Sequence, residues 1–200
     1  AVIGWGGVAV GRGGPTPAPT PRRSNEGAVR RSHDRALALA PRPSVSIAAM
    51  DNLVTLSEAE VAKARLHVDK IVRASGTTFF WAMRFLPGEK RRAMFAVYAF
   101  CRIVDDIADE PAPLDEKRRG LAQWRQEIRA LYSGRPGDAV AVALADPVAR
   151  FGMVEADFQA VIDGMETDAA EILRLETRDD LMVYCDRVAC AVGRLCCCIF

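Results

Sequence analysis

The stretch AVYAFCRIVDDIADE places four carboxylates directly after an almost unbroken apolar run. On a helix, Asp105 and Asp109 lie on one face because they are four residues apart, and Arg102 and Tyr98 continue that face. The other sides of this helix are nearly all apolar, which predicts a helix buried all round whose polar line faces an internal cavity or partner charges. Buried carboxylates are costly unless they are paired or bind a metal, and Arg102 alone cannot neutralise the three aspartates of this stretch.

A hard cation would balance this negative charge. Mg²⁺ prefers carboxylate oxygens, keeps several waters and completes its octahedral shell with phosphate oxygens of a substrate. An arginine one turn before the carboxylates supplies fork-shaped donors to the same phosphate oxygens. The pattern therefore indicates a magnesium and diphosphate site, whereas Asp109 and Glu110 taken alone also fit a solvated helix end with its acids in water.

The segments that must position these residues show a helical period from Ser57 onwards. Ser57 and Glu60 form a capping-box pattern at the start of the first helix, and SGTTFFW ends that helix. Pro111 and Pro113 end the helix that carries the acidic stretch. We predict helices over residues 57–74, 88–109, 114–132, 158–172 and 177–199. Since no segment alternates like a strand for more than a few residues, the sequence predicts an all-α domain over residues 50–200.

Residues 1–49 differ in composition from the rest of the chain. They are rich in Gly, Pro and Arg, hold seven Arg against two acidic residues, and lack an apolar period, which predicts a disordered leader. Their Arg-rich, acid-poor character fits an organellar transit segment, while Met50 before a well-formed helix start fits an upstream extension of the true start equally well. Gly4, Gly6 and Ala9 match a dinucleotide-binding fingerprint in spacing only, because no strand can precede them and no helix can follow.

Composition limits the partners and the compartment. The chain of 200 residues is half hydrophobic, enough for one sizeable core, and residues 50–200 hold 20 Lys and Arg against 24 Asp and Glu. A mildly acidic body lacks a basic nucleic-acid footprint, so we expect no nucleic-acid partner. Charges interrupt every apolar run before the roughly 18 residues of a membrane span, which leaves only peripheral membrane contact open. The six cysteines lack the paired spacing of a zinc site or a disulfide framework, so we expect reduced thiols and a cytoplasmic protein.

From Val68 to Phe200 the sequence resembles the squalene/phytoene synthase family, the head-to-head trans-prenyl transferases. SGTTFFWAMRFLP is similar to the family segment that lies over the diphosphate, YAFCRIVDDIAD to the first aspartate-rich motif, VIDGMETD to an internal stretch, and YCDRVACAVGRL to a YCxxVAxxVG helix. The resemblance implies an isoprenoid-synthase-type helical bundle. Among the subfamilies, these motifs look most like those of the bacterial presqualene diphosphate synthases of hopanoid pathways, with phytoene synthases as the runner-up.

The resemblance assigns roles to the residues of the acidic helix. It implies Asp105, Asp106 and Asp109 as Mg²⁺ ligands, and Tyr98 and Arg102 as contacts to the substrate diphosphate. The catalytic group would then consist of Tyr98, Arg102, Asp105 and Asp109.

Four further residues carry over from the family as substrate contacts. Phe79 would line the site near a flap, and Tyr184, Val188 and Gly193 would border the prenyl channel. By spacing alone, Tyr184 and Val188 share one helical face that also fits ordinary core packing. Glycine in a helix interior costs about 1 kcal/mol relative to Ala, so a close approach by ligand or backbone would explain Gly193.

The reaction that the resemblance implies is Mg²⁺-dependent ionisation of one farnesyl diphosphate and attack by the double bond of a second, giving presqualene diphosphate. A phytoene synthase acting on geranylgeranyl diphosphate is the alternative. The family's second aspartate-rich motif is missing before Phe200, and Asp163, Glu166 and Asp168 match the VIDGMETD stretch instead. We therefore expect a domain that is incomplete at its C-terminus and a 200-residue chain without turnover, which leaves a non-catalytic helical binding protein as a rival.

Overall fold

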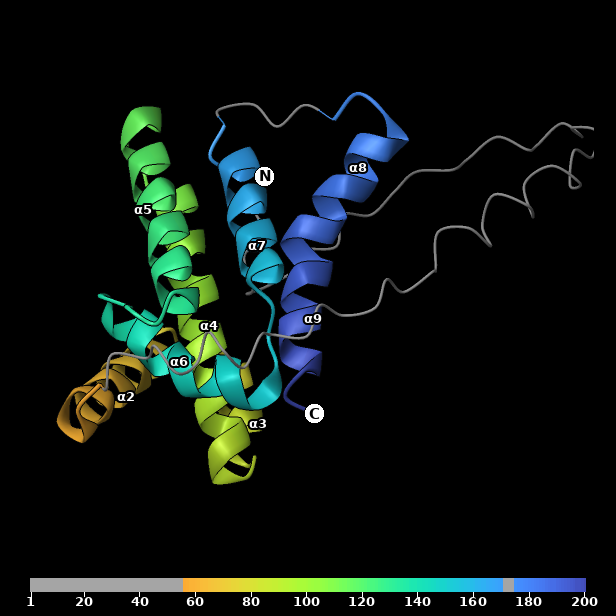
Figure 1. Cartoon of the computed structure of the whole chain (residues 1–200). Coiled ribbons are helices and arrows are strands. Elements are labelled where there is room, and N and C mark those ends of the chain that lie inside the picture. The colour runs from red at the N-terminus through yellow and green to blue at the C-terminus, as the bar shows by residue number, and fades with distance from the viewer. Residues whose placement is uncertain (1–55, 171–174) are drawn as a thin grey trace, which may run out of the picture. The chain divides into compact units, whose positions relative to one another are not determined.

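The computed structural model describes residues 56–170 and 175–200 (Figure 1). All of these belong to one compact unit. The predicted leader, residues 1–49, lies outside the described residues, and its boundary at Met50 stays a prediction.

The described residues form helices and contain no strand, so the all-α prediction is confirmed. The elements are α2 (Glu58–Ala74), α3 (Phe79–Arg84), α4 (Gly88–Asp109), α5 (Leu114–Tyr132), α6 (Ala139–Phe151), α7 (Glu155–Asp168), α8 (Arg178–Cys185), the π-helical turn η2 (Asp186–Cys190) and α9 (Ala191–Cys197). The last three follow one another without a break and form one long helix, called the α8–α9 helix below. Across residues 56–170 and 175–200, none of the helices is both long and apolar enough to traverse a bilayer.

Two helix starts are fixed by capping boxes, as their sequences predict. At the start of α2, the Glu60 N–H donates to Ser57 Oγ at 3.2 Å, and the Ser57 N–H donates to Glu60 Oε2 at 2.9 Å. At the start of α8, the Asp180 N–H donates to Thr177 Oγ1 at 3.1 Å and the Thr177 N–H donates to Asp180 Oδ2 at 2.9 Å. Each box satisfies backbone donors that the first helical turn leaves without intrahelical partners.

Helices α3 and α6 were not predicted from the sequence. Helix α3 forms inside SGTTFFWAMRF, immediately after the turn that ends α2. Helix α6 has two charged residues, Asp146 and Arg150, so its polar face is narrow, and Pro147 in its interior is a residue that normally ends a helix. The N-terminus of α6 is capped by Asp138, whose Oδ1 accepts from the Val140 N–H at 2.7 Å.

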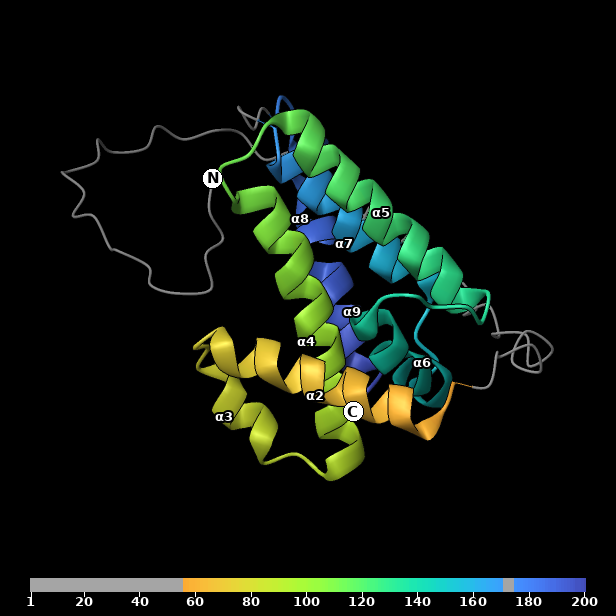
Figure 2. The ribbon, with the colours of Figure 1, turned by 90° about the vertical axis from the view of Figure 1, so that its left-hand side faces the viewer.

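Helix α4 is the central element around which the others pack. Helices α5 and α7 and the α8–α9 helix lie alongside it, and α2 crosses its N-terminal half (Figure 2). Ring contacts join three of these helices, because Phe100 of α4 lies with its centroid 5.7 Å from Trp124 of α5 and 5.2 Å from Phe158 of α7. This packing fixes the rotation of α4 about its own axis, and with it the direction of the polar line that the helix carries.

Gly164 of α7 is the glycine at which a side chain would collide with the α8–α9 helix. A Cβ added there would lie 2.9 Å from Val188 Cγ1 and 3.3 Å from the backbone carbonyl carbon of Arg187. A Cβ at Gly193 would meet nothing within 4 Å of the described residues, and Gly193 is exposed. Of the two explanations for Gly193, a close backbone approach is therefore not found within the described residues and occurs at Gly164 instead, while an approach by ligand stays a prediction.

We expect Gly164→Ala to lower the melting temperature of the chain, because overpacking a helix interface costs about 1–3 kcal/mol. The matched control, Gly193→Ala, is expected to leave the melting temperature unchanged or to raise it, since Ala is favoured over Gly in a helix by about 1 kcal/mol. Thermal unfolding followed by circular dichroism compares the two variants. Equal melting temperatures for both would contradict the tight contact at Gly164.

Candidate functional site

A cavity of about 200 Å³ lies between α3, α4, α7 and the α8–α9 helix. Most of its wall is apolar, and three polar side chains of α4 lie in it. Its lining residues are Phe79, Met83, Met94, Val97, Tyr98, Cys101, Arg102, Asp105, Val161, Met165, Val188, Val192 and Cys196. The structure therefore brings together five of the predicted site residues, and these come from three separate segments of the chain.

The polar line of α4 meets this cavity as its spacing predicts. Tyr98, Arg102 and Asp105 line the wall, whereas Asp109, one turn further on, is exposed and does not line it. The prediction of a helix buried all round holds best for the middle turns of α4, where six of the eight residues from Ala93 to Phe100 are buried. It is wrong for the acidic end, which is half-buried to exposed.

Arg102 is paired with two carboxylates of its own helix. It contacts Asp106 with two nitrogens, Nη2 at 2.5 Å from Oδ1 and Nε at 3.1 Å from Oδ2. Its contact with Asp105 is longer, with Nη1 at 3.6 Å from Oδ2. The guanidinium therefore offsets the charge of Asp106 more fully than that of Asp105.

Asp105 has a raised pKa of about 6. Burial is the main cause, and the negative charges of Asp109, Asp106 and Asp168 add to it, while Arg102 acts in the opposite direction. This environment disfavours the carboxylate form, and a cation bound beside it would favour that form. The groups around Asp105 therefore supply too little positive charge to balance its carboxylate.

Asp168, which the sequence assigns only to the VIDGMETD stretch, lies close enough to Asp105 to raise its pKa and so belongs to the site. It ends α7, and the Tyr184 hydroxyl donates to its Oδ1 at 2.7 Å. Burial raises the pKa of Asp168, the Tyr184 hydrogen bond lowers it, and the negative charge of Asp109 raises it further. A signal was present in the sequence, because Asp168 lies seven residues after Val161 and three after Met165, on the helical face that lines the cavity.

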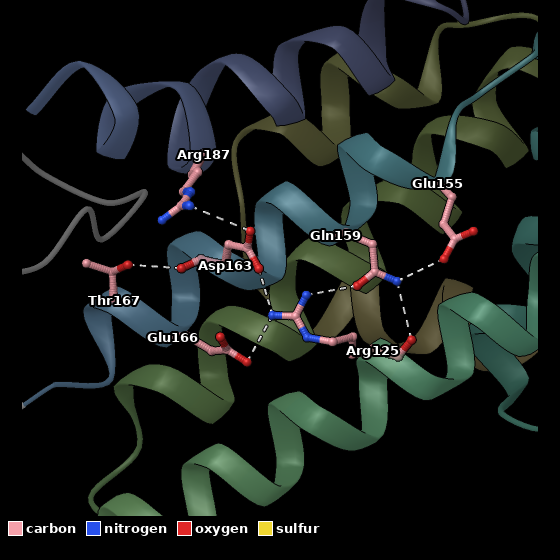
Figure 3. Close-up of polar contacts among 7 residues, drawn as sticks. All are labelled: Arg125, Glu155, Gln159, Asp163, Glu166, Thr167 and Arg187. Carbon is pink, nitrogen blue, oxygen red and sulfur yellow. Dashed lines mark hydrogen bonds and ion pairs between the residues drawn. The ribbon is translucent and has the colours of Figure 1, made fainter. Parts of the chain in front are cut away.

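Asp163 and Glu166 lie on a different side of α7 (Figure 3). Arg125 of α5 reaches both, with Nη2 2.7 Å from Asp163 Oδ1 and 3.0 Å from Glu166 Oε1. Arg187 lies 3.8 Å from Asp163 Oδ2, and Gln159 accepts from Arg125 Nη1 at 3.0 Å. Because arginines already offset their charge, these two acids tie α7 to α5 and do not add to the acidic cluster at Asp105.

Tyr184 lies near the site without lining the cavity, whereas two of the cysteines do line it. Tyr184 is buried but does not line the cavity, so it reaches the site only through Asp168. None of the six cysteines is paired in a disulfide in the structure, and their reduced state stays a prediction. Cys101 and Cys196 line the cavity, and burial raises the pKa of both thiols, which keeps them protonated. They behave as small apolar side chains at this position.

The acidic residues suit a magnesium ion in their chemistry. Within the described part of the chain, no three His, Cys, Asp or Glu side chains converge as a ready-made metal site. Mg²⁺ is usually held by only one or two carboxylates, with waters and substrate phosphates completing its shell. Asp105 and Asp109 fit this donor set, and Asp106 does so less well while Arg102 holds both of its oxygens.

The fold is that of the isoprenoid-synthase-type helical proteins. The chain is similar to the crystal structure of a squalene synthase from Alicyclobacillus acidocaldarius, with a TM-score of 0.64 and 28% identity over 72% of this chain and 54% of that one. Residues 72–200 match the family model of squalene/phytoene synthase. The chain therefore belongs to the squalene/phytoene synthase family, a family of prenyltransferases.

Within this family, the chain is similar to a presqualene diphosphate synthase of Rhodopseudomonas palustris, with 48% identity over 122 residues, which are 61% of this chain and 43% of that protein. A chloroplastic phytoene synthase of Zea mays is more distant, with 33% identity over 132 residues, 66% of this chain and 31% of that protein. The chain thus spans less than half the length of these two relatives.

Proposed function

We propose that the protein condenses two molecules of farnesyl diphosphate head to head into presqualene diphosphate, a precursor of squalene and hopanoids, with Mg²⁺ as cofactor. The observation that carries this proposal is an apolar cavity with Arg102 and Asp105 in its wall and further carboxylates beside them. The similarity to presqualene diphosphate synthases, closer than that to phytoene synthases, supports the choice of farnesyl diphosphate as substrate.

The polar side chains of α4 bind the diphosphate end of the substrate in this proposal. Arg102 donates hydrogen bonds to the leaving diphosphate, and the Tyr98 hydroxyl adds a further donor in the same wall. Asp105 and Asp109, with Asp106 beside them, would hold Mg²⁺, which when bound offsets the negative charge of the diphosphate. Asp168 adds negative charge from α7, and its hydrogen bond to Tyr184 holds it in place.

The apolar walls protect the carbon skeleton from water. Loss of diphosphate leaves an allylic cation, which water would quench, so the chemistry requires a site from which water is excluded. Phe79 and Met83 of α3 close one side of the cavity, and Val188 and Val192 of the α8–α9 helix close another. The role of Gly193 beside the prenyl channel stays a prediction, since Gly193 is exposed and does not line the cavity.

The test is incubation of the full-length protein with farnesyl diphosphate or geranylgeranyl diphosphate, each with Mg²⁺ or with a chelator. We expect presqualene diphosphate and released pyrophosphate from farnesyl diphosphate, and no product with the chelator. Product from geranylgeranyl diphosphate alone would identify a phytoene synthase instead. Tight binding of either substrate without product would favour the non-catalytic binding protein.

A further inference from the structure

A second hollow, separate from the cavity, lies between α2, α3 and the N-terminal end of α4. Its volume is about 630 Å³, and it shares no lining residue with the cavity. Five of its ten lining residues are arginines, while one is acidic. The lining residues are Ala62, Arg65, Leu66, Asp69, Arg73, Phe80, Arg84, Arg91, Arg92 and Phe95. We call this hollow the arginine groove.

The positive charge of the arginine groove is only partly offset. Arg73 and Arg65 have carboxylate partners at long range, Asp69 at 3.6 Å and Asp146 at 4.0 Å. For the other three arginines of the groove, no carboxylate lies within salt-bridge distance in residues 56–170 and 175–200. Because the chain as a whole is nearly neutral, this concentration of cations on one face requires a reason.

Large apolar side chains are exposed in and beside the arginine groove. Leu66 lines it and is 64% exposed, while Trp81, which is 60% exposed, and Phe85, which is 84% exposed, directly follow the lining residues Phe80 and Arg84 in sequence. The guanidinium carbon of Arg84 lies 5.6 Å from the centroid of the Trp81 ring, so charge and aromatic surface adjoin directly. Residues of this size are not normally left in water together on a monomer, and a group of them indicates an interaction site.

We infer that the arginine groove and the exposed side chains of Leu66, Trp81 and Phe85 form a docking surface for a bilayer that contains anionic lipids. Arginines attract anionic headgroups, and Trp and Phe insert at the boundary between headgroups and acyl chains. An acidic protein surface would be attracted by the arginines too, but a phenylalanine that is 84% exposed at the end of a short helix suits a fluid apolar phase better.

Helix α3 links this surface to the cavity. Its residues Phe79 and Met83 line the cavity, whereas Trp81 and Phe85 project outwards. Docking would therefore place one wall of the cavity at the membrane surface. A cavity at the membrane surface would suit a long isoprenoid product, which is poorly soluble in water, so this placement rests on the proposed function. The docking of the surface on a bilayer does not rest on it.

The test is co-sedimentation of the full-length protein with vesicles of phosphatidylcholine alone or mixed with phosphatidylglycerol. We expect binding to the mixed vesicles that weakens at high salt. A variant with Arg84→Gln, Arg91→Gln and Arg92→Gln is expected to bind these vesicles on the order of 100-fold more weakly, since each arginine contributes about a factor of five near an anionic surface. No binding, or equal binding to phosphatidylcholine vesicles, would overturn the inference.

The matched control removes the same number of arginine charges from another face of the molecule. Arg118→Gln, Arg119→Gln and Arg129→Gln alter three exposed arginines of α5 and are expected to keep vesicle binding within a few-fold of wild type. An equal loss in this control would show non-specific charge attraction and overturn the inference.

Quenching of tryptophan fluorescence by brominated lipids gives a second readout. Trp5→Phe is introduced first, because Trp5 would also fluoresce. In that background we expect Trp81→Phe to remove most of the quenching, because the remaining Trp124 is buried, and undiminished quenching would exclude insertion of α3.

Discussion

Replacing Asp105 by Asn in the full-length protein is expected to lower the turnover of farnesyl diphosphate by about 10²–10³-fold, the usual effect of removing one preorganised electrostatic contact. Asn keeps the shape of the side chain and removes the negative charge at the cavity wall. The measurement is kcat at saturating substrate over a series of Mg²⁺ concentrations. A ligand role for Asp105 also predicts that the variant needs a higher Mg²⁺ concentration for half-maximal rate.

The same substitution is not expected to destabilise the fold. The pKa of Asp105 is raised to about 6, so at pH 7 the ionised carboxylate opposes folding, and a neutral Asn removes that cost. Loss of the 3.6 Å contact with Arg102 offsets part of this gain. Thermal unfolding at pH 7 should therefore give a melting temperature close to or above that of wild type, which separates lost catalysis from lost structure.

Asp115→Asn is the matched control, because the Asp115 side chain is 91% exposed and its contact with Arg118 is 4.0 Å long. It should change neither turnover nor melting temperature. If Asp105→Asn keeps wild-type turnover with an unchanged Mg²⁺ requirement, Asp105 does not bind the metal.

Local patterns in the sequence predicted much of the fold. Helix α4 spans Gly88 to Asp109, as predicted, because prolines flank it on both sides and its apolar period is regular. Its polar line was also predictable, since residues three and four apart on one helix must share a face. Helix α6 was missed because its polar face is narrow, with Asp146 and Arg150 as its charged residues, and because Pro147 resembles a stop signal.

The parts of the site that join different helices were harder to predict. Asp168 belongs to it because α7 and the α8–α9 helix pack so that Tyr184 reaches the carboxylate, and no pattern within one helix shows that pairing. The two glycines make the same point. Gly164 and Gly193 both lie in helix interiors, and only the packing shows that a neighbouring helix comes close to the first and not to the second.

The second large effect is expected at Arg102, the cation that the acidic cluster surrounds. Arg102→Met removes the charge and all its donors, and we expect kcat/KM for farnesyl diphosphate to fall by about 10²–10³-fold. Arg102→Lys keeps the charge but loses the planar fork that holds two oxygens at once, so a smaller loss of about 10-fold or more is expected. The inhibition constant of inorganic pyrophosphate should rise in both variants, because the lost contact is to the diphosphate.

A positioning role for Arg102 through Asp106 is the competing explanation, because Arg102 holds both oxygens of that carboxylate. Asp106→Asn separates the two, since it breaks this ion pair and leaves the guanidinium free to bind diphosphate. Because Asp106 is also a proposed Mg²⁺ ligand, pyrophosphate binding is compared with a chelator present, so that loss of metal does not enter. If Arg102 contacts the diphosphate, Asp106→Asn should then leave pyrophosphate binding as strong as in wild type or make it stronger, while Arg102→Met weakens it. Equal weakening in both variants would show that Arg102 acts by orienting Asp106. Arg118→Met on the exposed face of α5 controls for loss of a surface arginine and should leave both constants unchanged.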